Sequence, residues 1–312
     1  MLTRRHIRIK VMQSLYAYSQ SANQDIKTEE KFLIKSMEEM YDLYLLLLDL
    51  LVELRSHALH YIEKGQQKHL PTVEDRDPNR KFVNNRLLEQ LEDFPTFREA
   101  LETRRLNHWK NDDEYVEVLW KEIIGSDIYA NYMSSRSGDF EEDRRFLIEI
   151  YTELIAPNEK LYDYLEDKKI TWVDDLPIVN TALIKMLQKT SEGKAPSLPK
   201  LYKNLEDREF AISLFRKTLL NDESLAAEME GKTPNWDKER IADLDAILLK
   251  MGICEFLKFP SIPIKVTINE YLEIAKEYST PKSSIFINGI LDKLSKEYQE
   301  SGKLNKMGRG LM

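Results

Sequence analysis

Acidic residues are absent from the first 24 positions of this 312-residue chain, although its formal net charge is −8. Thr3 is suited to cap a helix there, and such a helix carries Arg4, Arg5 and Arg8 in its first two turns. The positive end of the helix dipole disfavours each of these cations by up to about 1 kcal/mol. We therefore expect groups outside this helix to compensate the arginines.

Cysteine, glycine and proline are scarce: the chain has one cysteine, ten glycines and eleven prolines. A single cysteine excludes an intramolecular disulfide, and Cys254 lies in an apolar run that favours a buried thiol. Leu, Ile, Glu and Lys dominate instead, and these residues favour helices. No strand-like alternation of useful length occurs. The sequence therefore predicts an all-α fold.

Long hydrophobic runs are missing as well. The most hydrophobic segment, residues 41–54, is too short to span a membrane and contains Asp42 and Asp49. The start of the chain lacks the form of a signal peptide. We expect a soluble, cytoplasmic protein without membrane contact.

Enzyme motifs are also absent, since the sequence has no Walker loop, no GxGxxG and no CxxC. His57 and His60 lie three residues apart on an expected helix. No third ligand is near them in sequence, which disfavours zinc. We expect no catalytic activity, no cofactor and no metal site.

Charge is distributed unevenly along the chain. Residues 1–24 carry +4 and residues 258–312 carry +3, so the middle carries −15. Two basic ends on an acidic body indicate a local anion site, with ordinary solvated charge as the alternative. Arginine forks match phosphate geometry. An RNA strand bound near the first helix would relieve the unfavourable placement of its arginines.

Helical periodicity predicts one long helix over about 28–63, with an apolar seam from Leu33 to Tyr61. The polar stretch 125–143 is expected to be a connection between helices. Residues 243–259 form an almost wholly apolar run, which predicts a helix at the centre of a bundle.

Two segments resemble each other. Residues 144–187 match residues 208–252 in their apolar positions, and Trp172 and Trp236 lie 64 positions apart. Such internal similarity indicates a duplicated helical unit. Shared helical amphipathicity is the alternative explanation.

Local signals also mark the last third of the chain. Thr267 and Glu270 have the spacing of a capping box, so a helix is expected to start there. Ser283 is suited to cap the next helix. Gly289 lies inside that helix at a cost near 1 kcal/mol relative to alanine. Close approach of a neighbouring helix or a ligand would explain the glycine.

Three stretches carry a family resemblance. RRHIRIKVMQSLYAY (4–18) resembles the first helix of the bacterial transcription antitermination factor family NusB. IPIKVTINEYLEIAKEY (262–278) followed by FINGILDK (286–293) resembles that family's carboxy-terminal half in order and spacing. The resemblance covers residues 1–20 and about 205–297. A typical member has less than half the length of this chain.

The resemblance implies a NusB-like double helical bundle enlarged by an extra helical region. Residues 1–24 and 205–300 would form the RNA-binding domain. Residues 25–204 would be a helical insertion that holds the long helix and the first repeat copy. Residues 301–312 would be a basic flexible tail.

The resemblance also implies a function, namely binding of single-stranded boxA-type RNA from ribosomal RNA leaders. Ribosomal protein NusE and the RNA polymerase antitermination complex would be the protein partners. The positions carried over as RNA contacts are Arg5, Arg8, Gln13, Tyr16, Lys282 and Phe286, and we add Arg4 as a neighbouring cation. Asp245 matches an acidic position on the NusE-facing surface.

Some points stay open at this stage. Lys282 stands where many relatives have an acid, so a phosphate contact would replace the usual contact there. Tyr16 and Phe286 also suit a helix core. Monomer and homodimer are both compatible with the family. The alternative function is a helical protein-interaction scaffold for transcription or ribosome assembly, with the acidic insertion rather than RNA as its main binding surface.

Overall fold

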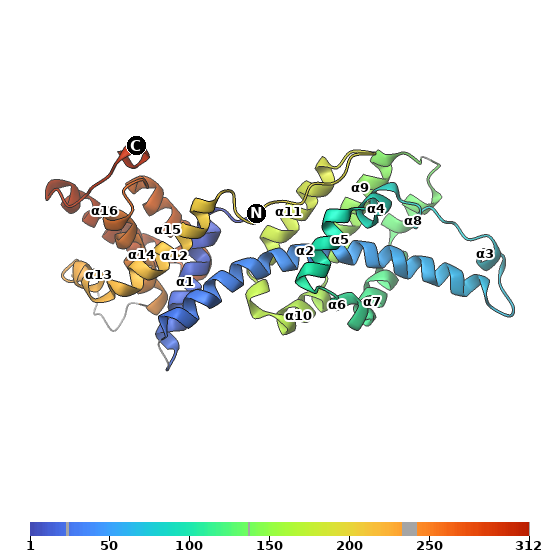
Figure 1. The fold of residues 1–312 in the computed structure, drawn as a ribbon, viewed down its shortest axis with the longest axis horizontal. Helices are drawn as coiled ribbons and strands as arrows, with labels where there is room; N and C mark the ends of the chain where they lie inside the picture. The colour runs from blue at the N-terminus through green and yellow to red at the C-terminus, as the bar shows by residue number, and fades with distance from the viewer. Residues whose placement is uncertain (23–24, 137, 233–241, 312) are drawn as a thin grey trace. The chain divides into compact units, whose positions relative to one another are not determined.

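The computed structural model describes residues 1–22, 25–136, 138–232 and 242–311, and every regular element in these ranges is a helix (Figure 1). This agrees with the predicted all-α fold. The chain divides into two compact units. We call Leu2–Met37 with Tyr202–Met312 the terminal unit, and Glu38–Leu201 the insertion unit. The domain limits proposed from sequence, 24/25 and 204/205, stay predictions.

The terminal unit is built around one buried helix. Helix α14 packs against α1, α12, α13, α15 and α16, which agrees with the central position expected from its apolar sequence (Figure 1). Its Cys254 is buried, as expected. The helices are α1 (Arg4–Gln20), α12 (Leu205–Leu220), α13 (Asp222–Met229), α14 (Asp243–Lys258), α15 (Ile264–Tyr278), α16 (Ser283–Glu300) and the 3-10 turn η4 (Gly308–Leu311).

A glycine permits the close packing of α14. A Cβ atom at Gly252 would lie 3.0 Å from Cδ2 of Leu291 on α16 and 3.4 Å from Cδ2 of Tyr271 on α15. Both neighbours are fully buried, so they have little room to move. Gly252 therefore allows three helices to meet at one point. Gly289 differs, because nothing lies within 4 Å of a Cβ built there.

The long helix is confirmed as α2 (Ile26–Gln66), and the unit boundary after residue 37 falls inside it. Its apolar seam is buried from Leu33 to Ala58, whereas Tyr61 is exposed. The other helices of the insertion unit are α3 (Val73–Arg76), α4 (Arg86–Glu92), α5 (Pro95–Arg104), α6 (His108–Asn111), α7 (Asp113–Ile124), α8 (Asp127–Ser134), α9 (Phe140–Ile150), η1 (Tyr151–Ile155, a π-helix), α10 (Glu159–Lys168), η2 (Ile170–Trp172) and α11 (Leu176–Lys189).

The two similar segments have the same order of elements. A long helix, a short helix and a second long helix follow one another in α9–η1, α10 and α11, and again in α12, α13 and α14. Trp172 is buried and donates through Nε1 to the carbonyl of Glu39 at 2.9 Å. Its proposed counterpart Trp236 lies outside the described residues, so the pairing of the two tryptophans stays a prediction.

Several local expectations were wrong. The stretch 125–143 holds α8 and the start of α9, because Ser126 and Asp139 accept hydrogen bonds from backbone N–H groups in the first turns of these helices. Thr267 does not cap α15, which starts one turn earlier at Ile264. Ser283 is likewise the first residue of α16 and not its cap.

The tail after α16 is bound rather than free over its described part. Nζ of Lys306 donates to the carbonyl oxygens of Glu255 and Phe259, at 3.0 Å each. The amide of Met307 donates to the carbonyl of Pro260 at 3.0 Å. These bonds attach the segment after α16 to the end of α14, where the carbonyl of Glu255 also accepts from the amide of Phe259. The predicted flexible tail is thus corrected up to residue 311.

Membrane-spanning segments were searched in the same residues. No helix among them is both long and apolar enough to cross a bilayer.

Candidate nucleic-acid interface

The start of α1 is fixed by a capping box. The Thr3 side chain accepts from the amide of His6, and the His6 side chain accepts from the amide of Thr3. Thr3 thus caps the helix as expected. Burial, followed by the charge of Arg5, lowers the pKa of His6 to about 4. His6 is therefore neutral at pH 7 and adds no charge to this end.

The first arginine is compensated by α12. Nε of Arg4 donates to Oδ1 of Asp207 at 2.9 Å, and its guanidinium lies 4.4 Å from the ring centroid of Phe210. Asp207 is buried, but the Arg4 side chain is half-exposed. Arg4 therefore keeps part of its donor edge toward solvent.

The second arginine is compensated by α15. Nε and Nη2 of Arg5 donate to the two carboxylate oxygens of Glu270, at 3.0 and 2.9 Å. This hydrogen-bonded pair raises the pKa of Arg5. The Arg5 side chain remains 40% exposed, so the pair lies at the surface.

The third arginine is buried. Nε and Nη2 of Arg8 donate to Glu255 on α14, at 2.7 and 2.9 Å, and the two side chains are 2% and 0% exposed. Thr267 and Tyr271 donate their hydroxyls to the same carboxylate, at 3.0 and 2.8 Å. Burial lowers the pKa of Arg8, but the charge and hydrogen bonds of Glu255 raise it by more. The net pKa is above the ordinary value.

The compensation expected for the arginines is therefore supplied by carboxylates of this chain. The two kinds of ion pair differ in strength. An exposed pair such as Arg5–Glu270 is worth about 0–1 kcal/mol, so an external phosphate can compete with Glu270. Breaking a buried pair such as Arg8–Glu255 costs about 3–5 kcal/mol, because one charge is left without a partner. The prediction that Arg8 contacts RNA is corrected: Arg8 anchors α1 to α14.

A cavity of about 530 Å³ opens at this end of α1. Arg4, Arg5 and Arg8 line it together with Glu270 and the turn that precedes α15. Other lining residues are Thr3, His6, Ser261, Ile262, Pro263 and Val266. The cavity is wide enough for a small anionic group, and the guanidinium groups of Arg4 and Arg5 are partly exposed there.

Other predicted RNA contacts lie outside this cavity. Tyr16 is 42% exposed on α1, and Gln13 is half-buried. Lys282 is exposed just before α16, and Phe286 on that helix is half-buried. Open space surrounds Gly289. Among the described residues nothing lies within 4 Å of a Cβ atom built at Gly289, so the expected close approach of a neighbouring helix is not observed.

Asp245 is buried instead of facing a partner. Its two carboxylate oxygens accept hydrogen bonds from the hydroxyls of Ser279, at 2.6 Å, and Ser283, at 2.7 Å. The side chain therefore ties α14 to the turn between α15 and α16. The prediction that Asp245 contacts NusE is corrected, because a 3% exposed residue cannot reach another protein.

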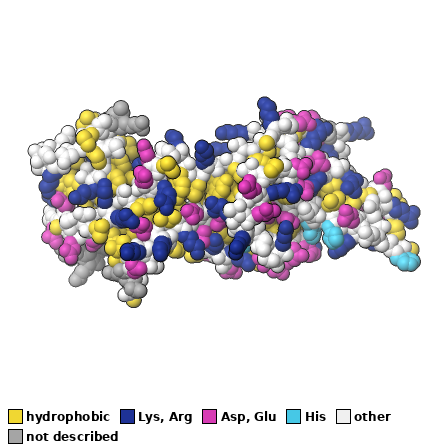
Figure 2. All heavy atoms as spheres, in the orientation of Figure 1, with side chains coloured by type: hydrophobic (Ala, Val, Ile, Leu, Met, Phe, Trp, Pro, Cys, Tyr) yellow, Lys and Arg dark blue, Asp and Glu magenta, His cyan; other side chains and the backbone are white. Residues whose placement is uncertain are grey.

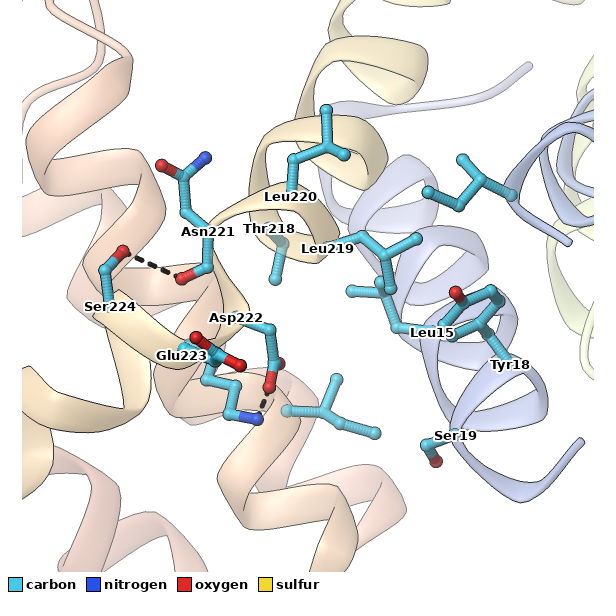
Figure 3. A pocket seen from close by; sticks show the side chains of 13 residues that line it. Leu15, Tyr18, Ser19, Thr218, Leu219, Leu220, Asn221, Asp222, Glu223 and Ser224 are labelled. Carbon is cyan, nitrogen blue, oxygen red and sulfur yellow. Dashed lines mark hydrogen bonds and ion pairs between the residues drawn. The ribbon is translucent and has the colours of Figure 1, made fainter. Parts of the chain in front are cut away.

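A second cavity, of about 810 Å³, lies at the opposite end of α1 (Figure 3). Leu15 and Tyr18 of α1 face Leu219 and Leu220 at the end of α12 across it. Its charged residue Asp222 is already paired with Lys250 at 2.6 Å. None of the predicted RNA contacts lines this cavity.

Charges of both signs are interspersed on the visible face of the molecule (Figure 2). The three arginines of α1 are likewise each paired with an acid. The cationic character of residues 1–24 is thus largely neutralised by acids from distant parts of the sequence, Asp207, Glu255 and Glu270.

Sequence reasoning missed those three acids. Glu255 had a readable signal, since it is a single acid inside the apolar run 251–257. A charge in such a run needs a buried partner. Asp207 stands in the charged run 206–209 and Glu270 next to Asn269, so neither carried such a signal in the sequence.

The family match begins in α11 of the insertion unit and ends in α16 of the terminal unit. The model of the NusB family matches residues 180–296. A transcription antitermination protein NusB from Salinibacter ruber (strain DSM 13855 / M31) is 46% identical over 105 residues, which cover 34% of this chain and 66% of that protein. The protein of the same name from Chloroherpeton thalassium (strain ATCC 35110 / GB-78) is 35% identical over 126 residues, 40% of this chain and 59% of that protein.

A third relative is covered more completely. The transcription antitermination protein NusB of Geotalea daltonii (strain DSM 22248 / JCM 15807 / FRC-32) is 36% identical over 116 residues, 36% of this chain and 77% of that protein. No solved structure matches the chain significantly. The all-α fold and a 36% identical relative covered over 77% of its length together identify a family of helical proteins. The chain belongs to the NusB family.

The matches cover only part of this chain and only part of each relative. The chain covers less than two thirds of the length of the first two relatives. The family match includes Lys282 and Phe286 but not α1 with Arg4 and Arg5. The family is non-enzymatic, in line with the sequence analysis.

Proposed function

We propose that this chain is a transcription antitermination factor that binds boxA-type RNA of ribosomal RNA leaders. It acts together with ribosomal protein NusE in the RNA polymerase antitermination complex and promotes transcription of rRNA operons. Family membership supports the class of function. The observation that carries the RNA contact is the cavity at the start of α1, where Arg4 and Arg5 are partly exposed and Arg5 is paired with the partly exposed Glu270.

The physical role of each group follows from its burial. A phosphate would displace Glu270 from Arg5 and share Arg4 with Asp207, while Arg8 stays bound to Glu255. The buried pair holds α1 in place, which fixes the exposed guanidinium groups in advance. Tyr16 is exposed, and nothing lies within 4 Å of a Cβ atom built at Gly289, so both positions are available to unstacked bases. Phosphate contacts then supply affinity, and base contacts supply selectivity.

The test is RNA binding by fluorescence anisotropy, on boxA RNA and a scrambled control, with and without NusE. In the double variant Arg4→Gln/Arg5→Gln we expect weaker binding. The slope of log K against log[salt] should fall by about 1.4, because each lost phosphate contact removes about 0.7 on single strands. The matched control, Arg76→Gln/Arg80→Gln, removes two exposed cations of the insertion unit. An unchanged slope in the first variant would refute the assignment.

A second candidate function is the protein-interaction scaffold. It is favoured by one observation, an acid-lined cavity in the insertion unit that contains a buried carboxylate without a partner. This function is compatible with RNA binding, because the two sites use different residues.

A further inference from the structure

The insertion unit contains a cavity of about 530 Å³ against the middle of α2. The end of α4, helix α5, the loop 105–107 and the start of α6 form the other walls. Those walls combine four apolar side chains, Leu91, Phe97, Leu101 and Leu106, with charged and polar residues. On α2, by contrast, the cavity is lined by two acids one helical turn apart, Asp49 and Glu53.

Asp49 is a buried carboxylate without a partner. Its residue is 9% exposed, and within the described part of the chain it forms no hydrogen bond and no ion pair. Burial, followed by the charge of Glu53, raises its pKa to about 7. The pKa of Glu53 is also raised, mainly by burial. Buried polar groups in proteins nearly always have partners, so Asp49 is an exception that needs an explanation, whereas Glu53 is half-buried.

The cations around the cavity do not supply the missing partner. Arg98 on α5 bonds to the carbonyl of Glu92 and lies 3.8 Å from its carboxylate. Lys110 on α6 is exposed and acts on Asp49 only through its charge.

The remaining charged groups are Glu102 on α5 and Arg105 in the following loop, both exposed at the rim. Within the described part of the chain none of these groups forms an ion pair with Asp49 or Glu53.

The chemistry of the missing ligand follows from these walls. Among the described residues no group of three or more His, Cys, Asp or Glu could hold a metal ion, so the complement is an organic cation. Apolar walls accept the methylene stem of a lysine, while its ammonium group reaches the polar end. An ammonium has three rotatable donors and can bond both carboxylates at once, which the flat arginine fork does less well.

We propose that this cavity receives a lysine side chain from a basic segment of a partner protein. The cavity volume lies within the range of binding pockets for sizeable ligands and exceeds a single side chain. Apolar neighbours of the lysine would fill the rest against Leu91 and Phe97. The site is separate from the RNA contacts and goes beyond the proposed antitermination function.

The test uses the full chain and a fluorescein-labelled, capped peptide Gly-Leu-Lys-Leu-Gly. The ligand control carries Nε-acetyl-lysine, which has the same stem without the charge. We expect the lysine peptide to bind at least tenfold more tightly than the acetylated one. Asp49→Asn and Glu53→Gln should each weaken binding at least tenfold. The matched control is Glu63→Gln, an exposed acid of α2 outside the cavity, and it should bind normally.

A pH series sharpens the result. Between pH 6 and pH 8 the affinity should rise, because Asp49 must lose its proton to accept the ammonium. The rise should be smaller in Asp49→Asn. Equal binding of both peptides, or unchanged binding by Asp49→Asn, would overturn the proposal. Binding of free spermidine through Asp49 without peptide binding would also overturn it, in favour of a small-molecule amine site.

Two controls separate this proposal from other failures. Thermal unfolding of Asp49→Asn should occur at or above the temperature of the unmodified protein, so lost binding would not reflect unfolding. boxA RNA binding should be the same in both proteins. A variant that loses RNA binding but keeps peptide binding would refute only the proposed function, and the reverse result would refute only this site.

Discussion

In the terminal unit the buried carboxylate of Glu255 accepts four hydrogen bonds, two from Arg8 and one each from Thr267 and Tyr271. In the insertion unit the buried carboxylate of Asp49 accepts none from any described residue. The first arrangement satisfies a charge so fully that it serves only structure. The second leaves a carboxylate without a hydrogen-bond donor or a paired cation among the described residues. The comparison teaches that burial alone does not identify a functional acid, and that a buried acid without a partner is the better candidate.

The largest expected effect is the loss of the satisfied pair. Arg8→Met should lower the free energy of unfolding by about 3–5 kcal/mol, because Glu255 keeps its charge without a counterion. Denaturant unfolding measures this. The double variant Arg8→Met/Glu255→Gln should recover much of the loss, since no buried charge remains. If the double variant is as unstable as the single one, the ion pair is not the reason for the effect.

Replacing Asp49, the buried acid without a partner, should change the free energy of unfolding in the opposite direction. Because folding raises the pKa of Asp49 to about 7, the native state holds its proton more tightly than the unfolded chain. The stability contribution of Asp49 is therefore neutral below about pH 4 and falls as pH rises to about 7. Asp49→Asn should stabilise the protein at pH 8 by on the order of 1–3 kcal/mol. Chemical unfolding at pH 5 and pH 8 would show it, and a destabilised variant at pH 8 would contradict it.

The smallest effect is expected at the exposed pair. Arg5→Gln should change the free energy of unfolding by less than about 1 kcal/mol, because solvent screens the Arg5–Glu270 pair. The same unfolding assay at low and high salt measures it. A loss as large as that of Arg8→Met would mean that Arg5 is also structural and unavailable to a phosphate.

Sequence patterns could predict the helices but not the partners of their charges. Periodicity located α2 and the central helix α14, and dipole reasoning showed that the arginines of α1 need compensation. The compensating acids lie 203 and 265 residues away for Arg4 and Arg5. Only tertiary packing brings such distant residues together.

Sequence motifs gave wrong predictions where a side chain makes tertiary contacts instead of the local or intermolecular contact that the motif suggests. Thr267 has the spacing of a cap, but α15 begins at Ile264 and the hydroxyl serves Glu255. Family positions carried over Arg8 and Asp245 as contacts, whereas packing buries both. Asp49 was visible only as an acid in an apolar run, because its cavity forms when α4, α5 and α6 pack against α2.

Glu255 also has a second attachment, through its backbone carbonyl, to Nζ of Lys306. One residue thus joins the first helix of the terminal unit by its side chain and the segment after the last helix by its main chain. A change in the position of α1 or of the segment that holds Lys306 would therefore act on the other through Glu255. Labels placed on residues 303–311 are therefore not neutral reporters, since they perturb the helix on which the half-exposed arginines stand.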